Sequence, residues 1–224
     1  MMDKNIRNII EVWGNRSFDD ALGDQEKEFF DIFLKIAISS NRILEIGVGS
    51  GRMIKILREN GVKAFFCGVD LTSNVAVAPC NRIIGDARQL PIKSESFDLV
   101  YSLGVVEHFP ETEQAIYEHS RVTKPNGYVL ITTPHVGIST VLRLISFYRK
   151  RQYKKGTFEV VRGRNLRLSS VKRMLRNAGL SIVYSQVIGK TFPHKYSRLG
   201  SIIDKVFVKK IFGPYLCVIG KKSP

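Results

Sequence analysis

The stretch Ile43-Leu44-Glu45-Ile46-Gly47-Val48-Gly49-Ser50-Gly51 decides how the rest of this sequence is interpreted. Its apolar residues up to Ile46 predict a buried strand, and the pattern from Arg52 to Asn60 predicts a helix directly after the glycines. Glycines between a strand and a helix allow a tight turn and let a ligand lie against the backbone at the helix N-terminus. The stretch therefore predicts a nucleotide-binding loop, and the alternative is a tight turn that binds nothing.

The spacing of these glycines differs from the dinucleotide-binding fingerprint. In GxGxxG the third glycine would fall at position 52, but that position is Arg52 and the third glycine arrives one residue early, at Gly51. Glu45, at the end of the strand, can accept a hydrogen bond from a ligand's ammonium group, directly or through water. Because a pyrophosphate offers no such group, the loop disfavours a nicotinamide or flavin and favours a ligand that carries a cation.

Two further acidic residues follow the next strands. Asp70 stands nineteen residues beyond Gly51 at the tip of the second strand, from which a carboxylate can accept both hydroxyls of a ribose. Asp86 follows the third strand, where its carboxylate can accept from an adenine amino group while the adjacent backbone amide donates to a ring nitrogen. The alternative for Asp86 is a turn cap. Together these positions describe an adenosine that carries an amino acid.

Strands alternate with helices along most of the chain, which predicts an α/β fold with a mainly parallel sheet. The apolar run Phe97–Ser102 is typical of a strand near the centre of such a sheet. A turn at Gly213-Pro214 would let the final strand reverse its direction. The expected strands are 42–46, 64–69, 82–84, 99–102, 128–133, 181–188 and 215–219, and the expected helices after the lead-in are 52–60, 112–123, 169–178 and 198–211.

In order and spacing, six motifs resemble those of class I S-adenosylmethionine-dependent methyltransferases. They are Leu44–Gly51, Gly68–Asp70, Gly85–Ala87, Phe97–Val100, Ser102–His108 and Lys124–Gly127, within a closely matching region of residues 42–134. The pattern is most similar to the small-molecule methyltransferases that include quinone- and sterol-methylating enzymes. The family's Pro-Gly-Gly loop reads Pro125-Asn126-Gly127 here, a mild departure because asparagine tolerates a left-handed backbone.

The resemblance implies a Rossmann-like three-layer sandwich with a mainly parallel seven-stranded sheet, its last strand antiparallel, and S-adenosylmethionine as the cofactor. It also implies a role for each matching position. Glu45, Gly47, Val48, Gly49 and Gly51 would hold the methionine moiety, Asp70 the ribose, Leu71 the adenine face, Asp86 and Ala87 the adenine edge, and Ser102 with Leu103 the methionine end.

Histidines and cysteines offer one catalytic candidate and no metal site. His108 follows the fourth strand, where an imidazole could take a proton from a substrate oxygen. The alternative is that Glu107-His108 begins a helix and orders the loop, because an activated methyl group can be transferred by proximity and alignment alone. His119, His135 and His194 show no metal-ligand spacing, and the three cysteines form no CxxC pair.

Length, composition and charge distribution set expectations for domains and location. The 224 residues suit a single domain, expected to comprise a helical lead-in (1–41), a cofactor-binding core (42–134), a basic lid or insertion (135–168) and a C-terminal part of the sheet (169–224). Residues 1–140 carry 15 Lys and Arg against 18 Asp and Glu, whereas residues 141–224 carry 20 against 2. The sequence has no apolar run long enough to span a membrane and no leader at its start, so a cytoplasmic protein is expected.

The basic region is informative about binding partners and not about the fold, because a positive field attracts anionic ligands, nucleic acid or acidic membrane surfaces. The leading hypothesis is methyl transfer to a small or lipid-linked, anionic acceptor, with segments 141–151 and 202–212 as candidates for peripheral contact with an anionic membrane. RNA methylation is the alternative, although Ser102-Leu103-Gly104-Val105 replaces the base-clamping Asn/Asp-Pro-Pro-Tyr motif. A non-catalytic S-adenosylmethionine-binding module is the third hypothesis.

Overall fold

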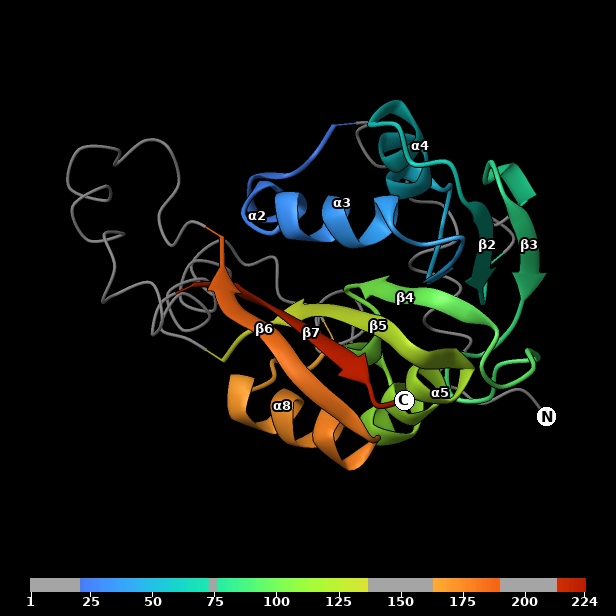
Figure 1. The fold of residues 1–224 in the computed structure, drawn as a ribbon. Helices are drawn as coiled ribbons and strands as arrows, with labels where there is room; N and C mark the ends of the chain where they lie inside the picture. Colours follow the sequence, from blue (N-terminus) through green and yellow to red (C-terminus); the bar gives the residue numbers. More distant parts are fainter. Residues whose placement is uncertain (1–20, 73–75, 137–162, 190–212) are drawn as a thin grey trace, which may run out of the picture.

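A seven-stranded sheet forms the middle layer of the protein (Figure 1). The computed structural model describes residues 21–72, 76–136, 163–189 and 213–224. The strands β1 to β5 pair in parallel, and β7 runs antiparallel to both β5 and β6, which confirms the predicted sheet. In spatial order the strands are β3 (Asn81–Ile84), β2 (Phe65–Asp70), β1 (Arg42–Ile46), β4 (Phe97–Leu103), β5 (Thr123–Pro134), β7 (Tyr215–Lys222) and β6 (Leu180–Ile188).

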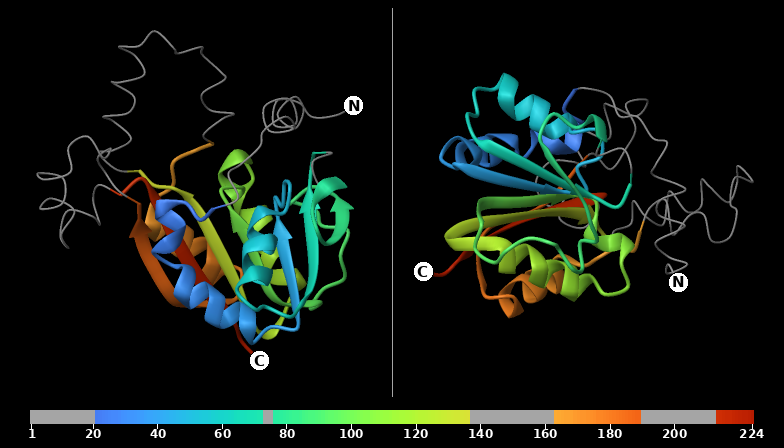
Figure 2. Two further views of the ribbon diagram at one scale, coloured as in Figure 1. Left: turned by 90° about the horizontal axis from the view of Figure 1, so that it is seen from above. Right: turned by 90° about the vertical axis from the view of Figure 1, so that its right-hand side faces the viewer.

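Helices cover both faces of this sheet, which completes the predicted three layers (Figure 2). The helices α3 (Phe30–Ile38) and α4 (Arg52–Glu59) lie on one face, and α5 (Thr112–Val122) and α8 (Leu168–Asn177) lie on the other. Successive strand residues enter opposite cores: Ile43 packs with α3 and α4, whereas Leu44 packs with α5 and α8. This two-sided burial explains why the strands are apolar on both faces.

The central position predicted for the Phe97–Ser102 run is confirmed, because β4 lies between β1 and β5 with Leu99, Val100 and Tyr101 fully buried. The strand order reverses at β1, which pairs with β2 on one side and with β4 on the other. In open α/β sheets such a reversal leaves a crevice at the carboxyl ends of the strands. The loops after β1, β2 and β4 therefore define where a ligand can bind.

Several element boundaries differ from the sequence-based expectation. β5 begins at Thr123, directly after α5, instead of at residue 128, and it includes Asn126 with a φ of 63°. A Cβ at Gly127 would lie 2.9 Å from Asp98 O. The glycine therefore allows the backbones of β4 and β5 to approach closely at this point. The expected helix 198–211 and residues 137–162 of the expected lid lie outside the described residues.

Phe33 holds the lead-in helix α3 against the sheet. Its side chain is fully buried, and its ring meets the Tyr101 ring edge-on, with centroids 4.9 Å apart. We predict that Phe33→Ala lowers the free energy of unfolding by about 3–5 kcal/mol, because it removes a buried ring and leaves a cavity. Chemical denaturation measures this change. Ile38→Ala, on the same helix but 59% exposed, is the matched control and should change stability by less than about 0.5 kcal/mol. Equal losses in the two variants would contradict the prediction.

Candidate active site

A cavity of about 380 Å³ opens at the carboxyl ends of β1, β2, β4 and β5, where the strand order reverses. We call one side the β1–β2 wall, lined by Glu45, Gly47, Val48, Gly49, Asp70, Leu71 and Ala87. We call the other side the β4–β5 wall, lined by Leu103, Gly104, Glu107, His108, Thr132, Pro134 and Asn165. Nine of the twelve residues predicted from the sequence thus line one cavity, and the exceptions are Gly51, Asp86 and Ser102.

The glycines of the loop after β1 are required by its backbone. Gly47, Gly49 and Gly51 have φ angles of 74°, 50° and 81°, in the left-handed region that disfavours side chains. A Cβ at Gly47 would lie 2.3 Å from Val105 Cγ2, whereas a Cβ at Gly49 would meet no atom within 4 Å. Gly51 caps α4 and packs against Pro79, so it shapes the loop without lining the cavity.

Glu45 places a buried carboxyl at the base of the β1–β2 wall. Tyr101 Oη donates a hydrogen bond to Glu45 Oε2 at 2.9 Å. Burial raises the pKa of Glu45 to about 8, against the opposing effects of the Tyr101 hydrogen bond and of the nearby Arg52 charge. A ligand cation in the cavity would favour the ionised carboxylate. The geometry therefore suits the ammonium-binding role that the sequence suggests.

Asp70 connects the tip of β2 to the glycine loop. Its Oδ2 accepts a hydrogen bond from Gly49 N at 2.8 Å, and its Oδ1 accepts from both the backbone N and the Oγ1 of Thr72, each at 2.8 Å. A carboxylate has about four acceptor sites, so these three bonds leave one, on Oδ2, for a hydroxyl of a ligand. Asp70 thus orders the loop in addition to facing the cavity.

Asp86 and Ser102 are not among the residues that line the cavity, and their assignment to cofactor contact stays a prediction. Although burial opposes the effect, hydrogen bonds from Arg88 hold the pKa of Asp86 below its usual value, and Arg88 Nη2 pairs with Asp86 Oδ2 at 2.8 Å. Asp86 Oδ1 also accepts from Arg88 N, so the side chain caps a turn. Ser102 is fully buried, 3.0 Å from His119 Nε2. Their chain neighbours Ala87 and Leu103 form the wall at these points.

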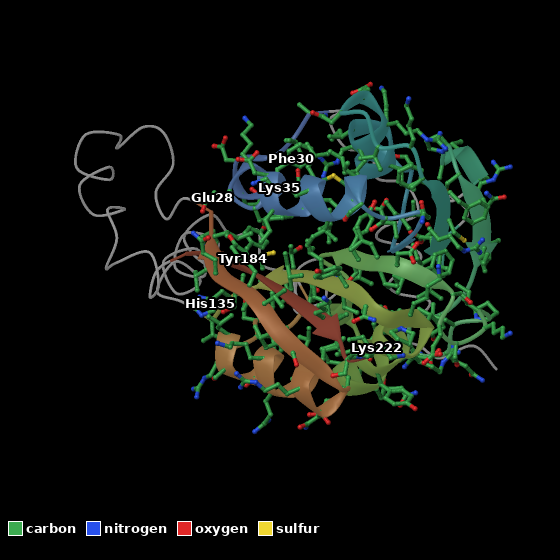
Figure 3. All side chains as sticks on the ribbon, in the orientation of Figure 1. Glu28, Phe30, Lys35, His135, Tyr184 and Lys222 are labelled. Atoms are coloured by element: carbon green, nitrogen blue, oxygen red, sulfur yellow. The ribbon has the colours of Figure 1, made fainter. Side chains whose placement is uncertain are left out.

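The lead-in contributes residues that the sequence did not single out. In α2 (Asp24–Lys27), the buried Glu26 forms a two-pronged ion pair with Arg52, and both side chains line the cavity beside Glu45. Glu28 accepts a hydrogen bond from Gly189 N at 3.1 Å, and Figure 3 shows Glu28 near Tyr184 of β6. In the sequence, Arg52 is distinguished only by its place at the third-glycine position of the dinucleotide fingerprint. Its partner lies too far away in the sequence for any local pattern to reveal the pair.

Two adjacent polar side chains, Glu107 and His108, occupy η2 (Val106–His108) after β4. Glu107 is buried, and His108 is half-buried in the same wall. The short helix agrees with the expectation that these residues order the loop, and the cavity position of His108 is compatible with its predicted catalytic role. The sequence named Glu107 only as a helix-starting residue.

Two of the other histidines, His119 and His135, are buried and lie within hydrogen-bond distance of backbone carbonyls. His119 is fully buried, and burial lowers its pKa to about 4, so it is neutral when its Nδ1 donates to Ala115 O. His135 is also buried, 3.2 Å from Gly213 O. His194 lies outside the described residues. Within the described ranges, no group of three or more His, Cys, Asp or Glu side chains is arranged to hold a metal ion.

Sequence comparison finds similarity between part of this chain and known methyltransferases. Residues 44–131 match the family model described as "Methyltransferase domain". The chain is 30% identical over 106 residues to phthiotriol/phenolphthiotriol dimycocerosates methyltransferase 1 of Mycobacterium ulcerans, covering 43% of this chain and 39% of the relative. It is 31% identical over 105 residues to the probable tRNA methyltransferase 9B of Homo sapiens, covering 44% and 22%. It is 25% identical over 185 residues to the ubiquinone biosynthesis O-methyltransferase of Pseudomonas putida, covering 76% and 77%.

A solved structure has a similar fold. The putative methyltransferase in complex with the Trm112 methyltransferase activator of Haloferax volcanii superposes with a TM-score of 0.69 at 17% identity, covering 98% of each chain. Residues 44–131 thus resemble a methyltransferase domain, and the chain shares its fold with a solved structure of a putative methyltransferase, in line with the resemblance to class I S-adenosylmethionine-dependent methyltransferases. S-Adenosylmethionine is the cofactor of that family. The chain spans less than half the length of the first two relatives named above.

The Glu45 carboxyl makes the stability of the ligand-free protein depend on pH. Its ordinary pKa of 4.5 applies to the unfolded chain, and burial raises the pKa to about 8 in the folded protein. The native state therefore favours the protonated form, and this contribution to stability is lost as the pH rises through about 8. We predict that the stability of Glu45→Gln relative to wild type increases as the pH is raised from 5 to 8.

Chemical denaturation at several pH values measures this difference. Glu113→Gln is the matched control, because Glu113 is an exposed residue of α5. Its stability relative to wild type should not follow the pH in this way. A difference between Glu45→Gln and wild type that stays constant from pH 5 to pH 8 would contradict the burial of an ionisable carboxyl at this site.

Proposed function

We propose that this protein transfers the methyl group of S-adenosylmethionine to a small or lipid-linked acceptor that carries an anionic group. The observation that carries the proposal is the cavity between the β1–β2 wall, whose residues fit the cofactor, and the β4–β5 wall, which is available to an acceptor. In the reaction, the acceptor's nucleophile attacks the methyl carbon, and the electron pair of the broken carbon–sulfur bond stays on sulfur. Alignment of the two reactants is the main catalytic requirement.

The residues of the β1–β2 wall fit the cofactor. Glu45 would accept from its ammonium group, Asp70 would accept from a ribose hydroxyl, and Leu71 with Ala87 would contact the adenine. The open space at Gly49 would let the cofactor lie against the loop backbone. A buried carboxyl with a raised pKa is costly unless it meets a cation, which supports this role for Glu45.

The β4–β5 wall and the charge distribution support the choice of acceptor. A cavity of about 380 Å³ suits a small molecule or the head of a lipid better than a folded polymer. The described residues after 162 include no Asp or Glu, whereas Arg167, Arg173 and Arg176 are exposed on or next to α8. These cations favour an anionic acceptor and peripheral contact with an anionic membrane. No helix in the described ranges is long and apolar enough to cross a membrane.

Methylation of RNA is the second candidate. The same cations could contact phosphates, and one relative is named a probable tRNA methyltransferase. RNA binding would show a steep loss of affinity with salt, because each neutralised phosphate releases counterions. A non-catalytic module would bind S-adenosylmethionine and transfer no methyl group.

Binding of S-adenosylmethionine to the purified protein tests the cofactor assignment. We predict binding by isothermal titration calorimetry and a loss of about 10- to 100-fold in affinity for Glu45→Gln, which removes a charge-assisted hydrogen bond. Affinity in the wild type should increase from pH 6 to pH 8, because Glu45 must release its proton to pair with an ammonium. Glu113→Gln should bind like wild type. The absence of binding by the wild type would contradict the proposal.

Release of S-adenosylhomocysteine in the presence of candidate acceptors tests the reaction. The probes are a catechol, a hydroxybenzoate, a long-chain alcohol in detergent micelles, a fatty acid, a primary amine and a transfer RNA transcript. We expect transfer to a small or lipid-like probe and none to RNA. Transfer to the transcript alone would replace the proposal with the RNA alternative.

A further inference from the structure

Glu107 is a buried titratable side chain of the β4–β5 wall. It follows β4 in η2, is 2% exposed, and lines the cavity beside His108. Its Oε1 lies 3.4 Å from the position that a Cβ on Gly104 would occupy, and Gly104 also lines the cavity. The missing side chain at Gly104 therefore leaves the carboxyl at the border of the open space.

The chain segment after residue 162 fixes Glu107 in this position. Arg164 N donates a hydrogen bond to Glu107 O at 3.0 Å, and Arg164 Nη2 donates to Pro110 O at 2.8 Å. A Cβ at Gly163 would lie 2.3 Å from Glu107 Cγ, so the segment packs directly on the glutamate side chain. These contacts hold the carboxyl inside the protein and prevent it from turning into solvent.

The other buried glutamates have strong partners, and Glu107 does not. Glu26 pairs with Arg52, Glu45 accepts from Tyr101, and Glu118 pairs with Arg121. Among the described residues, Glu107 Oε2 has no hydrogen-bond partner and no Lys or Arg forms an ion pair with the carboxyl. Because a buried polar atom without a partner is costly, such an atom calls for an explanation. Natural proteins retain an unfavourable buried group of this kind mainly at functional sites.

A nearby hydroxyl can serve the carboxyl in either protonation state. Thr133 Oγ1 of β5 is buried and also lacks a hydrogen-bond partner of normal geometry among the described residues. Burial raises the pKa of Glu107 to about 8, and Thr133 counteracts part of this rise. A threonine hydroxyl can donate to a carboxylate or accept from a protonated carboxyl. Glu107 can therefore gain and lose a proton near neutral pH without a change of fold.

We infer that Glu107 is the catalytic base that removes the proton from a hydroxyl group of the methyl acceptor. This inference rests on the proposed function and specifies the acceptor class. The O–H proton moves to the Glu107 carboxylate as the oxygen forms its bond to the methyl carbon. The carbon–sulfur bond breaks, its electron pair stays on sulfur, and the products are a methyl ether and S-adenosylhomocysteine.

A hydroxyl fits this site better than an ammonium. An ammonium would form an ion pair with the Glu107 carboxylate, which lowers the proton affinity of the carboxylate and stabilises the unreactive pair. A neutral hydroxyl leaves the proton affinity of the buried carboxylate high. A base whose pKa lies near the operating pH is also the most effective in proton transfer.

Glu107→Gln tests this inference, because the amide keeps the shape of the side chain and cannot accept the proton. We expect unchanged binding of S-adenosylmethionine and a fall in kcat of about 10²- to 10⁴-fold on the hydroxyl probes. In the wild type, kcat should rise as the pH approaches 8, and the variant should lose this dependence. Glu113→Gln, an exposed glutamate variant, should retain both the rate and its pH dependence.

Thermal stability at pH 8.5 separates a catalytic role from a structural one without any acceptor. If Glu107 serves catalysis, Glu107→Gln should melt at or above the wild-type temperature, because it removes a buried charge without a strong partner. A fall of more than about 4 °C would indicate a structural role and overturn the inference. Unchanged kcat in the variant, or wild-type transfer to none of the hydroxyl probes despite cofactor binding, would also overturn it. A wild type that binds no S-adenosylmethionine would instead refute the proposed function.

Discussion

The hydrogen bond from Gly49 N to Asp70 Oδ2 links the two loops on which the candidate site depends. Two further bonds, from Gly47 N and Val48 N to Val69 O, join the same loop to the end of β2. Left-handed glycines alone would permit many loop conformations, and these three bonds select one of them. The selected conformation leaves the Glu45 carboxyl and the open face of Gly49 on the cavity. The proposed cofactor site is therefore largely formed before any ligand arrives.

Two buried carboxyls lie on opposite walls of the cavity, and each has its own role in the proposed reaction. Glu45 on the β1–β2 wall is held by Tyr101, whose ring also contacts Phe33 of the lead-in helix. Glu107 on the β4–β5 wall is held through its backbone by the segment after residue 162. Burial raises the pKa of both groups to about 8. In the proposed reaction Glu45 binds the ammonium group of the cofactor and Glu107 accepts a proton from the acceptor. The energetic cost of burying a carboxyl thus serves binding at one wall and catalysis at the other.

The sequence predicted those parts of the molecule that depend on local spacing. The sheet, its central strand and the cavity positions of Glu45, Asp70 and the first two loop glycines followed from strand–loop–helix patterns, and the resemblance to methyltransferases followed from their order. The sequence left open whether Asp86 contacts a ligand or caps a turn, and the structure shows hydrogen bonds from Arg88, two residues further on, to the Asp86 carboxylate. The pairing of Glu26 with Arg52 and the isolation of Glu107 arise from contacts between distant segments, which no local pattern encodes.

A crystal structure of the protein with S-adenosylhomocysteine would test the central claim most directly. The account predicts that the amino group of the ligand lies within hydrogen-bond distance of the Glu45 carboxylate and that a ribose hydroxyl lies within reach of Asp70. It also predicts that the sulfur faces the β4–β5 wall, leaving space beside Glu107 for an acceptor hydroxyl. A ligand bound with its adenine at Glu45, or bound outside the cavity, would contradict the account.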